Sequence, residues 1–161
     1  MDVKKMIFRA PAYPFQADLG IGLLRISAGL IMLMAHGWPK YENFIMFSVA
    51  FPDPLGLGSQ LSLMLAIFAE LFCSLALIAG FATRLALVPL SFTMFIAFFV
   101  IHAADPFVNK ELALVYLMVF LILFITGPGR FSIDKYLYRK ISRPSDPEPK
   151  PQKQQDGNQS E

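Results

Sequence analysis

Long apolar runs, separated by short polar links, fill most of the sequence between residues 18 and 127. A helix that crosses a hydrocarbon core of about 30 Å needs roughly 20 apolar residues at about 1.5 Å per residue. Four runs come close to this length, and they cover residues 18–37, 61–81, 85–103 and 111–127. The pattern therefore predicts an all-α membrane protein, a four-helix transmembrane bundle.

The segments around these runs predict the rest of the chain, with a transmembrane domain over 18–142. Residues 1–17 do not have the pattern of a secretory signal peptide, and we expect an interfacial arm. The link 38–60 predicts either a short helix lying over the outer end of the bundle or an ordinary loop. Residues 132–141 predict an amphipathic surface helix that begins at Ser132, and residues 143–161 predict a disordered tail.

The positive charges are distributed unequally between the two sides of the predicted bundle. Outside the four spans, only Lys40 and Lys110 lie in the links 38–60 and 104–110. All other Lys and Arg residues outside the spans lie in the terminal segments or in the link that contains Arg84. The positive-inside rule therefore predicts that both termini are cytoplasmic and that the two longer links face outward.

Composition supports the membrane assignment and excludes several other classes. The chain of 161 residues is 55% hydrophobic and 16% charged, which is unusual for a soluble domain of this size. A net charge of +2 gives no basis for nucleic-acid binding, so the expected surroundings are the lipid bilayer. The single cysteine, Cys73, excludes an intrachain disulfide and is expected to be a packing residue.

Two charged residues fall inside the predicted spans, where an ionisable group is costly without a partner. Arg25 lies on a face of the first span with Gly22, Gly29 and His36, and Glu70 lies on a small-residue face of the second span. Their depths predict a buried ion pair between Arg25 and Glu70. This pair either fixes the register of the helices or forms the floor of a ligand pocket or a proton path.

A second group of polar residues is predicted at the outer end of the bundle, over an aromatic interior. It forms a candidate ligand pocket that consists of His36, Lys40, His102, Glu111 and Tyr116. Histidine and carboxylate groups exchange protons near neutral pH, which suits a site for a quinone headgroup. The alternatives are solvated helix ends, or a haem or metal site. No ligand spacing specific to haem or a metal is present, so haem is not favoured and no metal ligand is assigned.

Several stretches together resemble the DoxX family of small bacterial four-helix membrane proteins. The resemblance covers about residues 18–138, and each stretch is weak alone while their order and spacing are specific. The matching residues are Leu24, Arg25, Gly29, His36–Lys40, Glu70, Gly80–Arg84, Met94, Ala97, His102, Glu111–Tyr116 and Thr126–Asp134.

The resemblance implies a multi-pass protein of the bacterial inner membrane that is a subunit or accessory of a quinone-linked respiratory or redox complex. Subunits of such a complex would then be partners, and a homo-oligomer is compatible with the sequence. The family has no agreed catalytic residues, so an oxidoreductase activity of the chain alone is left open. The alternative is a non-catalytic scaffold or assembly subunit. A carrier is disfavoured, since the chain shows no inverted repeat.

Overall fold

The computed structural model describes residues 14–141. Most of the predicted arm 1–17 and all of the predicted tail 143–161 lie outside the described residues. Within the described range, four helices are long and apolar enough to cross a membrane. The prediction of an all-α bundle with four spans is therefore confirmed, and the spans are Phe15–Glu42, Ser59–Ala79, Thr83–Ile101 and Phe107–Thr126.

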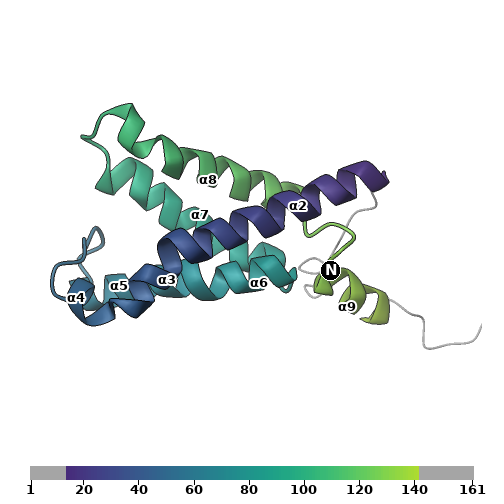
Figure 1. The fold of residues 1–161 in the computed structure, drawn as a ribbon, viewed down its shortest axis with the longest axis horizontal. Helices are drawn as coiled ribbons and strands as arrows, with labels where there is room; N and C mark the ends of the chain where they lie inside the picture. The colour runs from purple at the N-terminus through teal and green to yellow at the C-terminus, as the bar shows by residue number, and fades with distance from the viewer. Residues whose placement is uncertain (1–13, 142–161) are drawn as a thin grey trace, which may run out of the picture.

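The first two spans are each built from three consecutive helical segments (Figure 1). The first span is longer at both ends than the predicted 18–37, since it begins at Phe15 and continues through Pro39 to Glu42. Its segments are α2 (Phe15–Met32), η1 (Leu33–Gly37) and α3 (Trp38–Glu42). The second span contains α5 (Ser59–Ile67), η2 (Phe68–Cys73) and α6 (Ser74–Ala79).

The remaining elements complete the bundle and add two short helices. The third span consists of α7 (Thr83–Ile96) and η3 (Ala97–Ile101), and the fourth is α8 (Phe107–Thr126). In the link after the first span, α4 (Phe44–Ser48) packs beside α5, with Phe44 and Phe47 against a cluster that includes Leu63 and Ile67. After the last span comes α9 (Ile133–Ile141).

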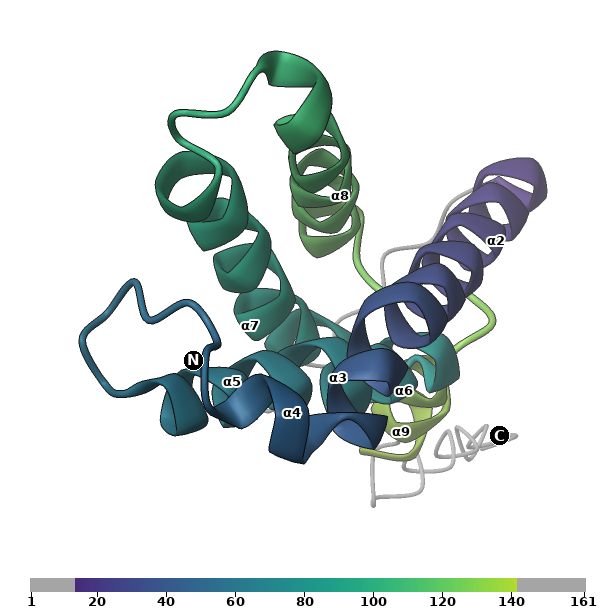
Figure 2. The ribbon, with the colours of Figure 1, turned by 60° about the vertical axis from the view of Figure 1, so that its left-hand side comes forward.

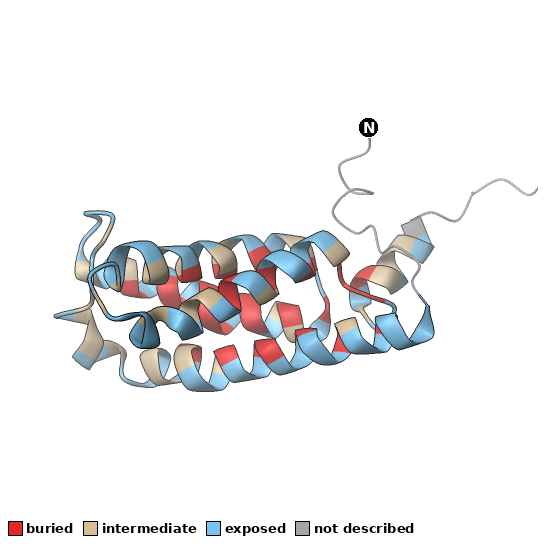
Figure 3. Cartoon of the chain, turned by 90° about the horizontal axis from the view of Figure 1, so that it is seen from above, coloured by how far each residue is buried: buried red, intermediate tan, exposed pale blue. Residues whose placement is uncertain are grey.

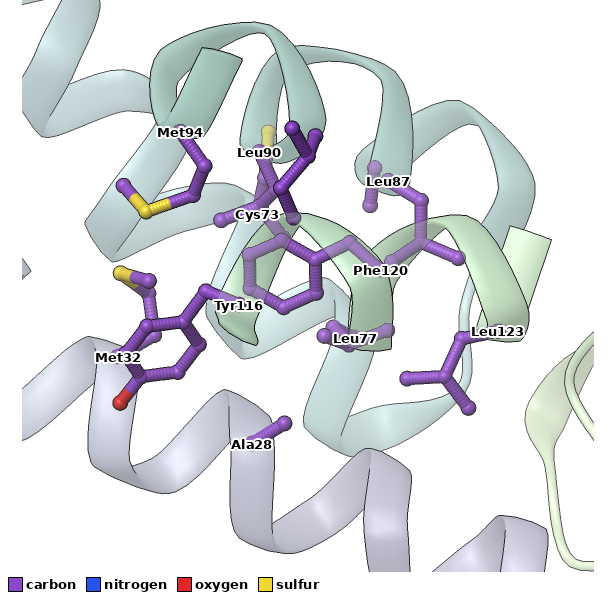
Figure 4. Packing of buried hydrophobic residues seen from close by; sticks show 12 residues of the cluster. Ala28, Met32, Cys73, Leu77, Leu87, Leu90, Met94, Tyr116, Phe120 and Leu123 are labelled. Carbon is purple, nitrogen blue, oxygen red and sulfur yellow. The ribbon is translucent and has the colours of Figure 1, made fainter. Parts of the chain in front are cut away.

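The spans meet in a small apolar core, shown in Figure 4. Met32, Leu77, Leu90 and Phe120 come one from each span and are fully buried. The side chains that point away from the core are also large and apolar, as the exposed outer faces in Figure 3 illustrate. Apolar residues on both faces are what a helix in lipid requires, and they explain why the helices have little amphipathic pattern.

The two ends of the bundle differ in shape. At the end that carries α9, here called the α9 end, α2, α6 and the segment before α9 pack closely. At the opposite end, here called the loop end, the pair α7 and α8 leans away from α3 and α5 (Figure 2).

Hydrogen bonds at the α9 end join three elements. The second span is followed by Gly80, which has a positive φ of 68°, and Phe81 N–H closes the turn on the Ala76 carbonyl. The buried carboxylate of Asp134 accepts hydrogen bonds from the backbone N–H groups of Ala82 and Thr83 at 2.7 and 2.8 Å, so α9 caps the start of α7.

The start of α9 itself agrees with the sequence. Ser132 Oγ accepts a hydrogen bond from the Lys135 backbone N–H at 3.2 Å, which is the cap predicted for this helix.

Candidate functional site

A cavity of about 620 Å³ lies between the helices toward the loop end. Its walls come from all four spans and from the loop that contains Phe51 and Leu55. Most of the walls are apolar, and a cavity of this size is typical of a site for a small molecule. The apolar wall residues within the spans include Leu65, Ala66, Phe68, Ala69, Phe92, Met94, Ala97, Leu112 and Ala113.

Five ionisable side chains line this cavity, and four of them belong to the predicted pocket. These are His36, Lys40, His102 and Tyr116, together with Glu70. The structure thus brings together four predicted pocket residues and adds the carboxylate that we had assigned to a separate ion pair.

The fifth predicted pocket residue, Glu111, does not line the cavity, and this prediction was wrong. On α8 the cavity is lined by Asn109, Leu112, Ala113 and Tyr116, which recur at three- and four-residue spacing. Glu111 lies between them in sequence and is exposed. At about 100° per residue, Glu111 projects from the opposite face of the helix. Its closeness in sequence to the lining residues therefore did not indicate a shared face.

The predicted Arg25–Glu70 ion pair is also wrong. The guanidinium of Arg25 donates instead to two backbone carbonyls, those of Leu77 and Phe131, each at 2.7 Å. It is almost fully buried and binds a carbonyl in the last turn of α6, which also accepts a hydrogen bond from the Gly80 N–H at 3.1 Å. Arg25 therefore connects the end of the second span to the segment before α9.

The error came from the register of the first two spans. The prediction placed their ends at the same level, but α2 extends past the end of α6 (Figure 1). The residue of the first span beside Glu70 is Gly37, where a Cβ would lie 2.5 Å from the Glu70 carbonyl oxygen. Leu77, beside Arg25, is seven residues further along the second span, a distance of about 10 Å that an arginine side chain does not cover.

The partner of Glu70 is Lys40. Lys40 Nζ lies 2.5 Å from Glu70 Oε2, and the two side chains are 21% and 4% exposed. The same ammonium group donates to the backbone carbonyl of His36 at 3.3 Å. A carboxylate inside a membrane span is costly without such a partner, so the pair accounts for Glu70 at this depth.

Two histidines occupy different positions at the cavity. The ring of His36 meets the ring of Tyr116 edge to face, with 5.8 Å between centroids, and Tyr116 stacks on Phe120. His102 follows η3, and its Nδ1 lies 2.7 Å from Asp105 Oδ2. His36 is thus held among the rings of the core, whereas the His102–Asp105 pair is partly exposed at the loop end.

Three of the ionisable side chains at the cavity, those of His36, Glu70 and His102, lie in or directly after a π-helical segment. His36 lies in η1, Glu70 lies in η2 and His102 directly follows η3. In η1 the Trp38 N–H reaches back five residues to the Leu33 carbonyl, and His102 N–H makes the same kind of bond to Ala97 O. Such wide turns are frequent at functional sites because they shift side chains away from the regular helical positions.

Sequence reasoning did not identify these wide turns. Pro39 was the available signal for η1, because proline has no N–H to donate to the carbonyl four residues before it. The other two segments contain no proline, and we find no sequence signal for them.

The loop 51–55 that closes part of the cavity is held by Asp53. Its carboxylate accepts hydrogen bonds from Ser62 Oγ, from Gly58 N–H and from Leu57 N–H, at 2.7, 2.7 and 2.9 Å. The hydrogen bond from the Ser62 hydroxyl, followed by that from Gly58, lowers the pKa of Asp53 below its ordinary value. The loop is therefore tied to the first turns of α5.

The cavity combines a few polar side chains with an extensive apolar wall. Among residues 14–141, no group of three or more His, Cys, Asp and Glu side chains is placed to hold a metal ion. The polar groups at the cavity offer hydrogen-bond donors from Lys40, Tyr116 and the histidine rings. The arrangement suits a lipophilic molecule with oxygen acceptors.

Comparison with known proteins shows what the chain is similar to. Residues 20–103 match the family model described as DoxX. This match covers most of the first span and all of the second and third spans, and it includes Arg25, His36, Lys40 and Glu70. It confirms the resemblance predicted from the short sequence stretches.

Two curated proteins are similar over 127 residues each. An uncharacterized protein of Haemophilus influenzae is 31% identical over 74% of this chain and 92% of its own length. The Inner membrane protein YqjF of Escherichia coli is 32% identical over 76% of this chain and 95% of its own length. No solved structure matches the chain.

Proposed function

The chain belongs to the DoxX family and is a multi-pass protein of the inner membrane, and from this premise we propose that its cavity binds a quinone. In this proposal the protein is a subunit or accessory of a quinone-linked redox complex and needs no turnover of its own. The observation that carries the proposal is an apolar cavity within the spans that has the Lys40–Glu70 pair on its wall.

The form of the cavity supports a flat, lipophilic ligand. Apolar side chains dominate the walls, and the aromatic rings of Phe68, Phe92 and Tyr116 take part in them. Aromatic rings pack well on a flat conjugated ring through offset stacking or edge contacts. The volume of about 620 Å³ is sufficient for a ring headgroup with the beginning of a tail.

The hydrogen bonds of Lys40 support a ligand with a carbonyl oxygen. An ammonium group has three N–H donors. One donates to Glu70 and one to the His36 carbonyl, which leaves a third for another acceptor. Because Lys40 lines the cavity, a quinone carbonyl is a suitable acceptor for that third donor.

The histidines support proton exchange with the bound headgroup. His36 lies within the cavity wall, and the His102–Asp105 pair lies between the cavity and the exposed loop end. A histidine ring beside a carboxylate can accept and pass on a proton, which suits the proton uptake that accompanies quinone reduction. The electrons would come from the partner complex.

The test is mass spectrometry of organic extracts from the purified protein. The wild type, the double variant Lys40→Met/Glu70→Gln and the control Glu111→Gln are purified in mild detergent. The double variant removes both charges together and leaves no buried unpaired charge. Glu111 is exposed on the opposite face of α8, so its variant is a matched carboxylate control.

We expect about one quinone per protein in the wild type and the control, and a loss of quinone from the double variant, because Lys40 holds the carbonyl. An extract of the wild type that contains only ordinary lipid, in the same amount as in an unrelated membrane protein of similar size, overturns the proposal. A scaffold role in the membrane is then the better account.

A further inference from the structure

We infer that the cavity opens sideways into the hydrocarbon layer between α5 and α7, and that the ligand's tail leaves through this opening. This inference rests on the proposed function, because it assigns the position of the tail of a ligand whose headgroup lies near Lys40. It specifies the ligand class as an amphiphile with an oxygen-bearing headgroup and a long hydrocarbon tail.

The opening is indicated by side chains that face the cavity and the exterior together. Leu65 and Phe68, in the second span, are 47% and 52% exposed, and both line the cavity. Phe92, on α7, is 52% exposed and also lines it. Phe68 belongs to η2, which packs against α7, and Leu65 lies about one turn before Phe68 on α5, so we assign the three side chains to the rim of one lateral opening.

The depth of these residues places the opening in the hydrocarbon region. Leu65 and Phe68 lie six and nine residues into the second span, which corresponds to roughly 9 and 14 Å from its start at Ser59. All three rim residues are apolar. A hydrocarbon tail at this depth stays in an apolar environment, whereas a polar group there would lose its hydration.

A route past the loop end is less suited to a tail. The cavity there reaches Pro52, Leu55 and Asn109, and Asp53 ties this loop to Ser62. A tail that left in this direction would pass the His102–Asp105 pair and reach the interface. Exposure of apolar carbon to water there would cost free energy that the lateral route avoids.

The ligand class follows from the two parts of the site. The headgroup is a hydrogen-bond acceptor that fits beside Lys40, and the tail is too long for the cavity and continues into the bilayer. A water-soluble molecule of the same headgroup uses only the polar part of the site. It therefore lacks the packing contacts that the first part of the tail makes with the rim residues, and binds more weakly than the tailed molecule.

The experiment compares two quinones with the full-length protein in lipid nanodiscs. One is a ubiquinone with a long isoprenoid tail, and the other is the same ring without a tail. Both are titrated against the wild type, Leu65→Trp and the control Met64→Trp. Met64 is on the same helix and is 51% exposed, but it does not line this cavity.

We expect Leu65→Trp to weaken binding of the tailed quinone by about tenfold, because the larger indole obstructs the path of the tail at the rim. Binding of the tail-less ring and all binding to Met64→Trp should remain at the wild-type level. Equal effects of Leu65→Trp on both quinones, or no effect on either, overturn the lateral opening while the proposed function stands. Absence of binding of both quinones to the wild type overturns the proposed function together with this inference.

Discussion

Lys40 and Glu70 form an ion pair with 2.5 Å between Nζ and Oε2, across two spans and 30 positions of sequence. The pair stands on the wall of the cavity, and the backbone of Gly37 packs against the backbone of Glu70 one helical turn away from Lys40. The close approach of the two helices thus brings the ammonium group to the carboxylate. The pair links the packing of the first two spans with the polar end of the proposed ligand site.

The first prediction concerns the energy of this pair. Glu70→Gln leaves the Lys40 charge without its partner, so we expect the free energy of unfolding to fall by about 3 kcal/mol. The double variant Lys40→Met/Glu70→Gln removes both charges and should recover most of this loss. Unfolding in detergent micelles, followed by circular dichroism, measures both effects.

The control for the ion pair is Glu111→Gln, which should change stability by no more than about 0.5 kcal/mol because Glu111 is exposed. If the double variant is less stable than Glu70→Gln, the two side chains are not a coupled pair.

The second prediction concerns Arg25. Its two hydrogen bonds to the carbonyls of Leu77 and Phe131 need the fork of the guanidinium, which lysine lacks. Arg25→Lys should therefore lower the free energy of unfolding by about 2 kcal/mol, the value of one lost hydrogen bond from a charged donor. Arg139→Lys, at an exposed position of α9, is the matched control. Stability equal to that of the control would argue against the role of Arg25 in joining α6 to the α9 segment.

The sequence was sufficient to predict the spans and four of the side chains that line the cavity. Apolar runs are a strong signal because a helix in lipid must be apolar over nearly its whole length. The chemistry of His36, Lys40, His102 and Tyr116 was also visible, since polar residues near the ends of apolar runs are few. The cavity then brought these four together as expected.

The pairing of charges was not predictable from the sequence. It depends on how far one helix slides along the next, and small residues such as Gly29 and Gly37 set that register through contacts that a single sequence does not reveal. A slide of about two turns separated Arg25 from Glu70. The wrong placement of Glu111 has a simpler cause, because its helical position lies on the face of α8 opposite to the residues that line the cavity.

The third prediction is a pH dependence in the loop 51–55. The pKa of Asp53 is lowered by its hydrogen bonds from Ser62 and Gly58, so the bonds persist above the ordinary pKa of aspartate. Their contribution to the stability of the folded state is lost as the pH falls through the lowered folded-state pKa of Asp53. A carboxyl-carbon NMR titration should give Asp53 a lower pKa than an exposed aspartate. Ser62→Ala should move this pKa upward, and an unchanged pKa in that variant would contradict the assignment.

The fourth prediction concerns orientation in the membrane. The excess of Lys and Arg at the α9 end predicts that this end and both termini face the cytoplasm. A reporter that is active only in the cytoplasm should be active when fused after residue 161 and inactive when inserted in the link near Gly56. The reverse pattern would contradict this orientation and place the His102–Asp105 pair on the cytoplasmic side.

The most direct test of the central claim is photolabelling in membranes with an azido-substituted quinone. The cross-linked residues are mapped by mass spectrometry of peptides from the intact, full-length protein. If the cavity binds quinone, the label is expected on cavity residues such as His36, Met94 or Tyr116, and excess unlabelled quinone should suppress it. Label on the outer face of α4 alone, or label on the cavity that excess quinone does not reduce, would contradict a quinone site in this protein.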